Sequence, residues 1–121
     1  MNTVYGLQNT GYTLLMPTLT VNGRSWFFTE HKATTSRPAL VLIHGAGGRH
    51  LDWPSELRYL PETAVFTPDL PGHNQSDPPG RNQIDDYASD LTDFVETLGL
   101  QNVVLVGHSM GGGIAQTIGL R

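Results

Sequence analysis

The sequence predicts an α/β fold, a parallel sheet with helices on both faces and an antiparallel hairpin at its N-terminal end. Three short, mainly apolar runs, at residues 39–43, 65–66 and 102–106, end at glycine or proline. Such runs are typical of strands buried on both faces. A segment with helical periodicity, residues 83–98, separates the second run from the third. Because apolar strands that alternate with helices favour parallel pairing, these observations together predict the fold class.

The residues ahead of the first run predict a hairpin and a loop. Residues 19–21 and 25–28 flank the dipeptide Asn22-Gly23. This dipeptide tolerates positive φ at both positions and therefore favours a tight hairpin turn. Residues 31–38 are polar and end in proline, which suits a loop. Residues 1–16 show no clear period and are interpreted as a loosely held leader.

The clearest helix is predicted over residues 83–98. Asp85 and Asp86 lie in its first turn, where negative charge suits the helix dipole, and Gly99 follows as a C-terminal stop. A shorter helix is predicted over residues 53–60. The apolar face of the long helix has 3.6-residue spacing and consists of Ile84, Tyr87, Ala88, Leu91, Phe94, Val95 and Leu98. The opposite, acidic face is interpreted as solvated and carries Asp90, Asp93 and Glu96.

Composition excludes several classes of protein. The chain has 121 residues, 7 Lys and Arg against 11 Asp and Glu, and no cysteine. No basic cluster for nucleic acid is expected, nor a disulfide framework, a thiolate zinc site or a thiol nucleophile. The five histidines are scattered without H-x-x-x-H spacing, so no metal is expected. The longest apolar runs have about five residues, whereas a membrane span needs roughly 20. The sequence also shows no secretory pattern, so we expect a cytoplasmic protein without a membrane partner.

The strongest functional signal is a G-x-S-x-G pattern at residues 107–111, directly after the third apolar run. A serine on a sharp turn from strand to helix has strained backbone geometry and projects its hydroxyl clear of the sheet. The positions two before and two after the serine are crowded, so only small side chains fit there. Gly107 and Gly111 occupy these positions. A helix over residues 112–118 would direct its N-terminal amides and dipole at a developing oxyanion. The pattern predicts a nucleophile, Ser109; the alternative is a glycine-rich turn whose serine only caps the helix.

Two further segments follow the other apolar runs. Residues 44–48 are glycine-rich, which lets the backbone approach a ligand and aim amide groups at it; the alternative is a flexible turn. Neither G-x-x-x-x-G-K-[ST] nor G-x-G-x-x-G occurs, so phosphate binding is disfavoured and no cofactor is expected. In residues 69–77, Pro71-Gly72 marks a turn, and Asp69 is predicted to brace it by accepting backbone hydrogen bonds.

His108, beside the serine, is chemically suited to act as a general base. Adjacent side chains on a strand point to opposite faces, so His108 is predicted to support the turn rather than act on the serine.

These three motifs, in this order and each after a strand, resemble the α/β-hydrolase fold family, in particular its esterases. The resemblance covers residues 17–121, interpreted as the N-terminal part of one domain. Asn74 stands where the family commonly has glycine, but asparagine tolerates left-handed geometry. The resemblance implies that Ser109 is the nucleophile and that the backbone N–H groups of Ala46 and Met110 form an oxyanion hole. It also implies structural support of the site by His44, Gly45, Gly107, His108 and Gly111.

The family's triad runs serine, then Asp or Glu, then His along the chain. The sequence continues for only twelve residues after Ser109 and contains no acid or histidine there. The chain is therefore expected to be the N-terminal part of a longer hydrolase, lacking the triad partners and the cap region. The strand before the serine would then leave an open apolar edge.

The expected function is acyl transfer from a small ester or related acyl compound to Ser109, followed by hydrolysis. Carbon–carbon bond hydrolysis or a peroxidase-like activity would share the same apparatus. The serine at this position disfavours the aspartate nucleophile of dehalogenase-like and epoxide-hydrolase-like relatives. The alternative is a truncated, non-catalytic module that binds a ligand or partner through its sheet.

Overall fold

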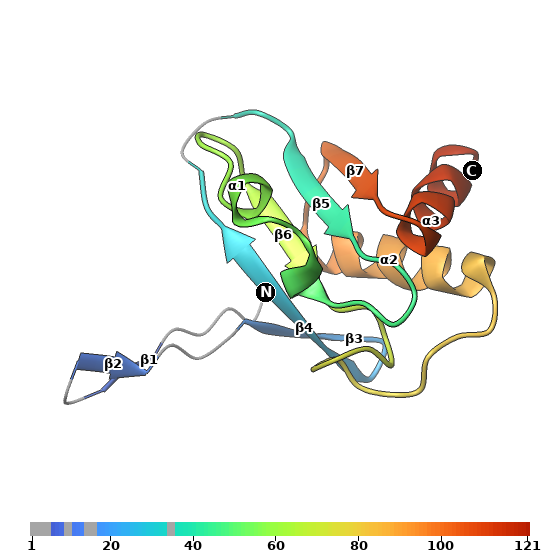
Figure 1. The fold of residues 1–121 in the computed structure, drawn as a ribbon, viewed down its shortest axis with the longest axis horizontal. Helices are drawn as coiled ribbons and strands as arrows, with labels where there is room; N and C mark the ends of the chain where they lie inside the picture. The colour runs from blue at the N-terminus through green and yellow to red at the C-terminus, as the bar shows by residue number, and fades with distance from the viewer. Residues whose placement is uncertain (1–5, 9–10, 14–16, 34–35) are drawn as a thin grey trace.

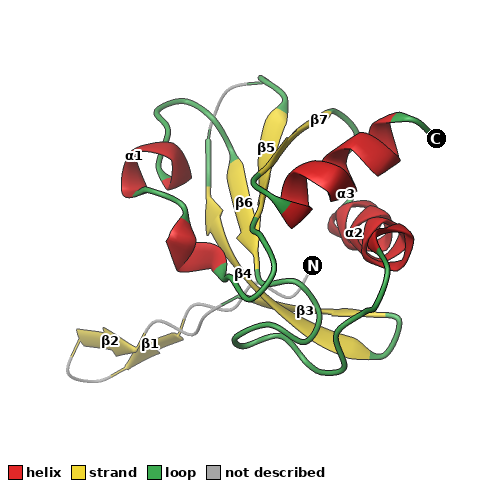
Figure 2. Ribbon diagram, turned by 45° about the vertical axis from the view of Figure 1, so that its right-hand side comes forward, coloured by secondary structure: helices red, strands yellow, loops and turns green. Residues whose placement is uncertain are grey.

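The structure, a computed structural model, describes residues 6–8, 11–13, 17–33 and 36–121. They form a two-stranded ribbon and a five-stranded mixed sheet with α1 on one face and α2 and α3 on the other (Figures 1 and 2). The α/β fold class is confirmed. The elements are β1 (Gly6–Gln8), β2 (Gly11–Thr13), β3 (Thr18–Val21), β4 (Arg24–His31), β5 (Ala39–Ile43), a 3-10 turn η1 (His50–Asp52), α1 (Ser55–Arg58), β6 (Val65–Pro68), α2 (Ile84–Leu98), β7 (Val103–Gly107) and α3 (Met110–Gly119).

The sheet order β3-β4-β6-β5-β7 brings the three motifs to one edge. β5 lies between β6 and β7 and is parallel to both, with Leu40 opposite Val65 and Ile43 opposite Gly107. The carboxyl ends of parallel strands share one edge of a sheet, so the segments that follow β5, β6 and β7 lie together.

The predicted hairpin is β3 and β4, and its turn has φ of 50° at Asn22 and 80° at Gly23. β4 continues to His31, where a loop was predicted to begin, because its last residues pair antiparallel with β6. The sheet is therefore mixed rather than wholly parallel. This pairing joins segments more than thirty residues apart, and neither segment's local pattern reveals it.

The leader predicted over residues 1–16 lies mostly outside the described residues. In its described part β1 pairs antiparallel with β2, with Leu7 opposite Tyr12.

The hydrophobic core lies between the sheet and α2. Phe94 of α2 stacks on Trp26 of β4 with ring centroids 4.6 Å apart. Tyr87, Ala88 and Leu91 of the predicted apolar face are also buried, whereas Ile84 is 38% exposed. The second predicted helix is shorter than expected, since α1 begins only after Pro54.

Two residues on the acidic face of α2 accept hydrogen bonds from residues outside the helix. Arg81 donates two hydrogen bonds to the Asp90 carboxylate, of 2.8 and 2.9 Å. Asn22 of the hairpin turn donates one of 2.7 Å to Asp93. The face lies at the surface, and two of its three acidic residues also make exposed hydrogen bonds there.

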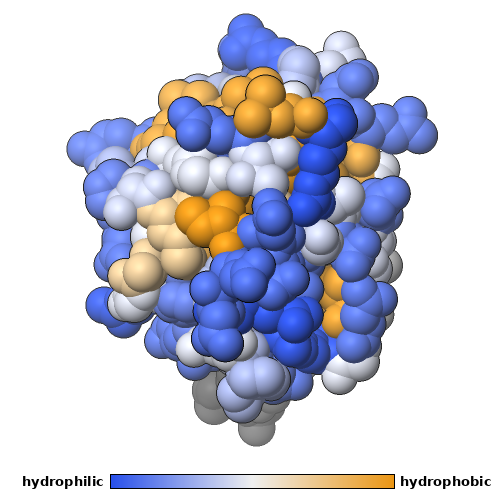
Figure 3. Space-filling model, turned by 90° about the vertical axis from the view of Figure 1, so that its right-hand side faces the viewer, coloured by the Kyte–Doolittle hydropathy of each residue, from blue (hydrophilic) through white to orange (hydrophobic). Residues whose placement is uncertain are grey.

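In the described part of the chain β7 pairs only with β5, so its outer edge is open. Val104 is 47% exposed, and a groove of about 160 Å³ between β7, α2 and α3 is lined largely by apolar side chains. Figure 3, which views the molecule from the right-hand side of Figure 1, shows hydrophobic surface at the top and in the centre of this face, among hydrophilic residues.

Candidate active site

Ser109 occupies the turn between β7 and α3 with strained backbone geometry. Its φ of 56° and ψ of −118° are conformations that residues other than glycine seldom adopt. The side chain is exposed and makes no capping hydrogen bond to α3. The alternative in which this serine merely caps the helix is therefore excluded.

Backbone hydrogen bonds hold the 107–111 turn in this shape. The Ser109 carbonyl accepts from the N–H groups of Gly112 and Gly113, at 2.9 and 3.2 Å. On the other side, His108 N–H donates to the Ile43 carbonyl at 3.1 Å, and the His108 carbonyl accepts from Gly111 N–H at 2.9 Å. The backbone of His108 thus joins the turn to the end of β5.

The two outer glycines of the turn lie where no side chain fits. A Cβ on Gly107 would collide with the Gly111 carbonyl group. A Cβ on Gly111 would collide with the Ile43 carbonyl and lie 2.7 Å from the His44 carbonyl oxygen. These close approaches set α3 directly against the ends of β5 and β7.

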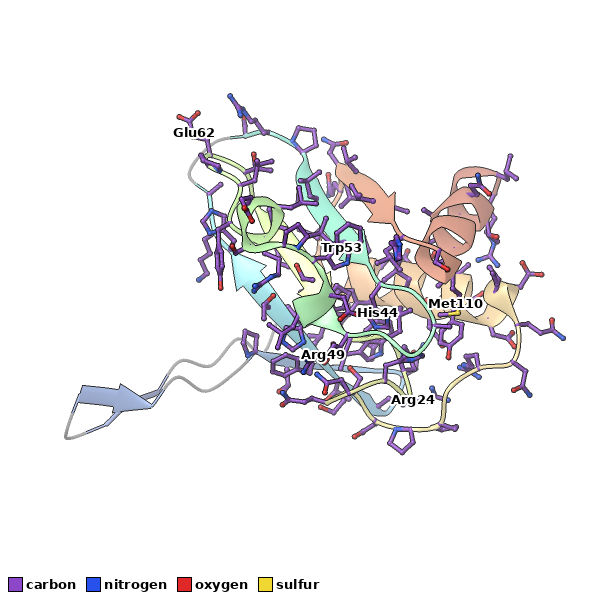
Figure 4. All side chains as sticks on the ribbon, in the orientation of Figure 1. Arg24, His44, Arg49, Trp53, Glu62 and Met110 are labelled. Atoms are coloured by element: carbon purple, nitrogen blue, oxygen red, sulfur yellow. The ribbon has the colours of Figure 1, made fainter. Side chains whose placement is uncertain are left out.

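The 44–48 loop lies beside the serine. A Cβ on Gly45 would lie 3.2 Å from Ser109 Cβ and 3.3 Å from the His108 carbonyl oxygen, so only glycine allows this approach without displacement. Ala46 N–H and Met110 N–H have no hydrogen-bond acceptor within the described residues. Figure 4 shows Met110 at the start of α3, near His44 at the end of β5.

His44 links the 44–48 loop to the segment after β6. Its Nδ1 lies 2.7 Å from the Gly45 carbonyl oxygen, and its Nε2 lies 3.0 Å from the Leu70 nitrogen. A carbonyl only accepts and an amide only donates, so the network assigns the neutral ring with its proton on Nδ1. His44 is 1% exposed, and this burial lowers the pKa of its ring, which favours that neutral form.

His73 is a site residue that the sequence did not identify. Its Nδ1 lies 3.1 Å from the Pro71 carbonyl, and its Nε2 accepts from Gly47 N–H at 3.1 Å. The His73 and His44 rings lie 4.9 Å apart. In the sequence His73 is one of five separated histidines, and no spacing marks the 26 residues between it and Gly47.

Asp69 braces the segment after β6 as predicted. Fully buried, its carboxylate accepts hydrogen bonds from the backbone N–H and Nδ1 of His50, at 2.6 and 2.9 Å. It also accepts from Asn74 Nδ2 and Gln75 N–H, at 3.0 and 3.3 Å. Asn74 has a φ of 46°, the left-handed geometry expected where the family commonly has glycine.

A cavity of about 340 Å³ opens beside the 107–111 turn. The residues that line it include Gly45, His108, Trp53 and Pro54. This volume is in the range of small-molecule sites.

In the part of the chain that the structure describes, the His108 side chain makes no hydrogen bond. The same residues contain no group of three His, Asp or Glu side chains that could hold a metal ion. No described helix is long and apolar enough to cross a membrane.

Comparison with known proteins agrees with this geometry. The model of the alpha/beta hydrolase fold family matches residues 38–121. Lipase LipV of Mycobacterium tuberculosis is 40% identical over 81 residues, which cover 66% of this chain and 31% of the lipase. Epoxide hydrolase 4 of Mus musculus is 34% identical over 86 residues, 68% of this chain and 24% of that enzyme.

The fold is also found in solved structures. The crystal structure of a membrane phospholipase A superposes with a TM-score of 0.81 at 28% identity, covering 88% of this chain and 35% of that one. The chain thus spans about a third or less of the length of these proteins. The β5, β6 and β7 motifs, the strained serine and the match over residues 38–121 lead to one conclusion: the chain belongs to the alpha/beta hydrolase fold family.

Proposed function

We propose that the protein containing this chain is a hydrolase of small esters or related acyl compounds, with Ser109 as its nucleophile. The observation that carries the proposal is the Ser109 backbone, whose φ of 56° holds an exposed hydroxyl at the edge of the sheet without a capping bond. Strain of this kind persists only where the surrounding structure enforces it. A hydroxyl at this position suits attack on a carbonyl carbon.

In the proposed reaction, Ser109 Oγ forms a bond to the substrate carbonyl carbon while a base takes the hydroxyl proton. Collapse of the tetrahedral intermediate breaks the bond to the leaving group, which receives that proton. Water then hydrolyses the acyl-enzyme by the same steps and regenerates the serine. The family's order of triad residues assigns the base and its acid partner to positions after Ser109, and we place them beyond Arg121 in the longer protein.

The negative oxygen of the intermediate would be held by Ala46 N–H and Met110 N–H. Both amides lack an acceptor within the described residues and belong to the two segments that meet at the serine. Met110 is also the first residue of α3, where the helix dipole favours negative charge. The cavity of about 340 Å³, which Gly45 and His108 of the same two segments line, would take the substrate.

The relatives support hydrolase activity, but their names indicate classes of hydrolase that use different nucleophiles. An epoxide hydrolase and a lipase are both similar to this chain. A serine at position 109 favours acyl chemistry over attack by a carboxylate.

The test is covalent labelling of the full-length protein by a fluorophosphonate, which reacts with activated serines. We expect S109A to abolish labelling. The matched control S89A, on the exposed side of α2, should label like the wild type. Equal labelling of S109A and wild type would refute the assignment, and absence of labelling in the wild type would favour the non-catalytic module.

A further inference from the structure

Each of the two peptide groups that flank the α-carbon of Ala46 is hydrogen-bonded to a different histidine. The Gly45 carbonyl accepts from His44 Nδ1 at 2.7 Å, and Gly47 N–H donates to His73 Nε2 at 3.1 Å. A peptide group is planar, so the Gly45 carbonyl and Ala46 N–H form one rigid unit and point in opposite directions. The Gly45 carbonyl also accepts from Gly48 N–H at 3.0 Å, so these two bonds together set the direction of Ala46 N–H.

The second peptide group joins the Ala46 carbonyl to Gly47 N–H and lies inside a turn that the hydrogen bond from Gly48 N–H to the Gly45 carbonyl closes at 3.0 Å. Gly47 is exposed, its φ is +70°, and a Cβ built on it would meet nothing within 4 Å. Packing therefore does not fix this residue. The hydrogen bond to His73 ties this turn to the segment after β6, which the backbone bond within the turn does not do.

The two histidines are arranged reciprocally. Each ring bonds through Nδ1 to a carbonyl of its own segment, Gly45 for His44 and Pro71 for His73. Each accepts through Nε2 from an amide of the other segment, Leu70 N–H for His44 and Gly47 N–H for His73. The neutral form with its proton on Nδ1 satisfies both rings.

We propose that His73 is a positioning residue for the 44–48 loop, because by accepting from Gly47 N–H it restrains Ala46 and keeps Ala46 N–H directed at the oxyanion. This inference rests on the proposed function, since it needs Ala46 N–H to act on the intermediate.

The titratable groups around His73 come from three elements. They are the His44 ring on the 44–48 loop, the Tyr87 ring on α2 at 6.0 Å, and the Asp69 carboxylate, which binds the neighbouring Asn74. His44 has its own Nε2 acceptor role at Leu70 N–H, so it cannot replace His73 at Gly47.

The catalytic test uses H73Q and H73F in the full-length protein, with p-nitrophenyl acetate as substrate. Displacement of an oxyanion donor acts on the transition state, so we expect H73F to lower kcat by about tenfold or more with KM little changed. Glutamine carries an oxygen acceptor and should keep most of the wild-type kcat. Wild-type kcat in H73F, or an equal loss in H73Q and H73F, would overturn the proposal.

The structural test does not depend on activity. In the wild type, we expect NMR to detect a nitrogen–nitrogen coupling across the hydrogen bond from Gly47 N–H to His73 Nε2. In H73F this amide should exchange with solvent faster than in the wild type, and in H73Q at close to the wild-type rate. Absence of the coupling, or equal exchange of the Gly47 amide in the three proteins, would refute the positioning role. The coupling in the wild type decides the question even if H73F fails to fold.

The two sets of results separate this inference from the proposed function. Retention of esterase activity by S109A would overturn the function and the catalytic part of the inference. The Gly47 amide would still decide whether His73 restrains the loop.

Discussion

Gly111, in the first turn of α3, lies with its α-carbon against the backbone carbonyl of Ile43 at the end of β5. The atoms nearest to a Cβ built on Gly111 all belong to the main chain of Ile43 and His44, so no flexible side chain could move away. The position of Ser109, two residues earlier, therefore depends on the absence of a side chain at Gly111.

A methyl group at this position should destabilise the fold. We expect G111A to lower the free energy of unfolding by about 1–3 kcal/mol or more, the range for overpacking a close contact. The matched control is G119A, at the end of the same helix, where a Cβ meets nothing within 4 Å. It should be neutral or stabilise by up to about 1 kcal/mol, because alanine favours helix. Urea unfolding measures both, and equal midpoints for the two variants would contradict the packing described.

Removal of the Asp69 carboxylate should lower the free energy of unfolding more than G111A does. Its loss in D69A leaves the buried donors of His50 without acceptors and frees Asn74 and Gln75. We expect a loss of about 2–5 kcal/mol in the free energy of unfolding, because each buried donor left without an acceptor costs about 1–3 kcal/mol. D93A, which removes one hydrogen bond at the surface, should cost about 1 kcal/mol or less. A small effect of D69A in chemical denaturation would argue against the bracing role.

Stability should fall on the acid side of neutrality because of His44. Burial lowers its pKa below the ordinary value of 6.5, so the unfolded chain binds a proton more readily than the folded one. The stability that the neutral ring contributes is fully present above about 6.5 and is lost as pH falls through the folded pKa. H44Q, which keeps an acceptor and a donor, should show a shallower fall in urea titrations from pH 8 to pH 5. An identical slope in both proteins would exclude His44 as the cause.

Local patterns predicted the elements well where one segment determines them. The Asn22-Gly23 turn, the strand at residues 39–43 and the long helix ending at Gly99 all occur as expected. Each depends on backbone preference or hydrophobic spacing within a few residues. The crowding at Gly107 and Gly111 was likewise predictable, because the G-x-S-x-G pattern carries a steric requirement.

Features that depend on distant pairing escaped prediction. β4 extends to His31 because β6 pairs with it, and the acidic face of α2 binds Arg81 and Asn22. The role of His73 depends on an amide 26 positions away that the sheet order brings alongside. Such contacts follow from the topology as a whole, so no single motif contains them.

The central claim is that Ser109 is the nucleophile, and mass spectrometry of the phosphonate adduct tests it most directly. Trypsin cleaves after Arg81 and Arg121, so one peptide carries both Ser89 and Ser109. Fragmentation of that peptide from labelled full-length protein should place the phosphonyl group on Ser109. An adduct on Ser89, or on any residue outside this peptide, would contradict the account.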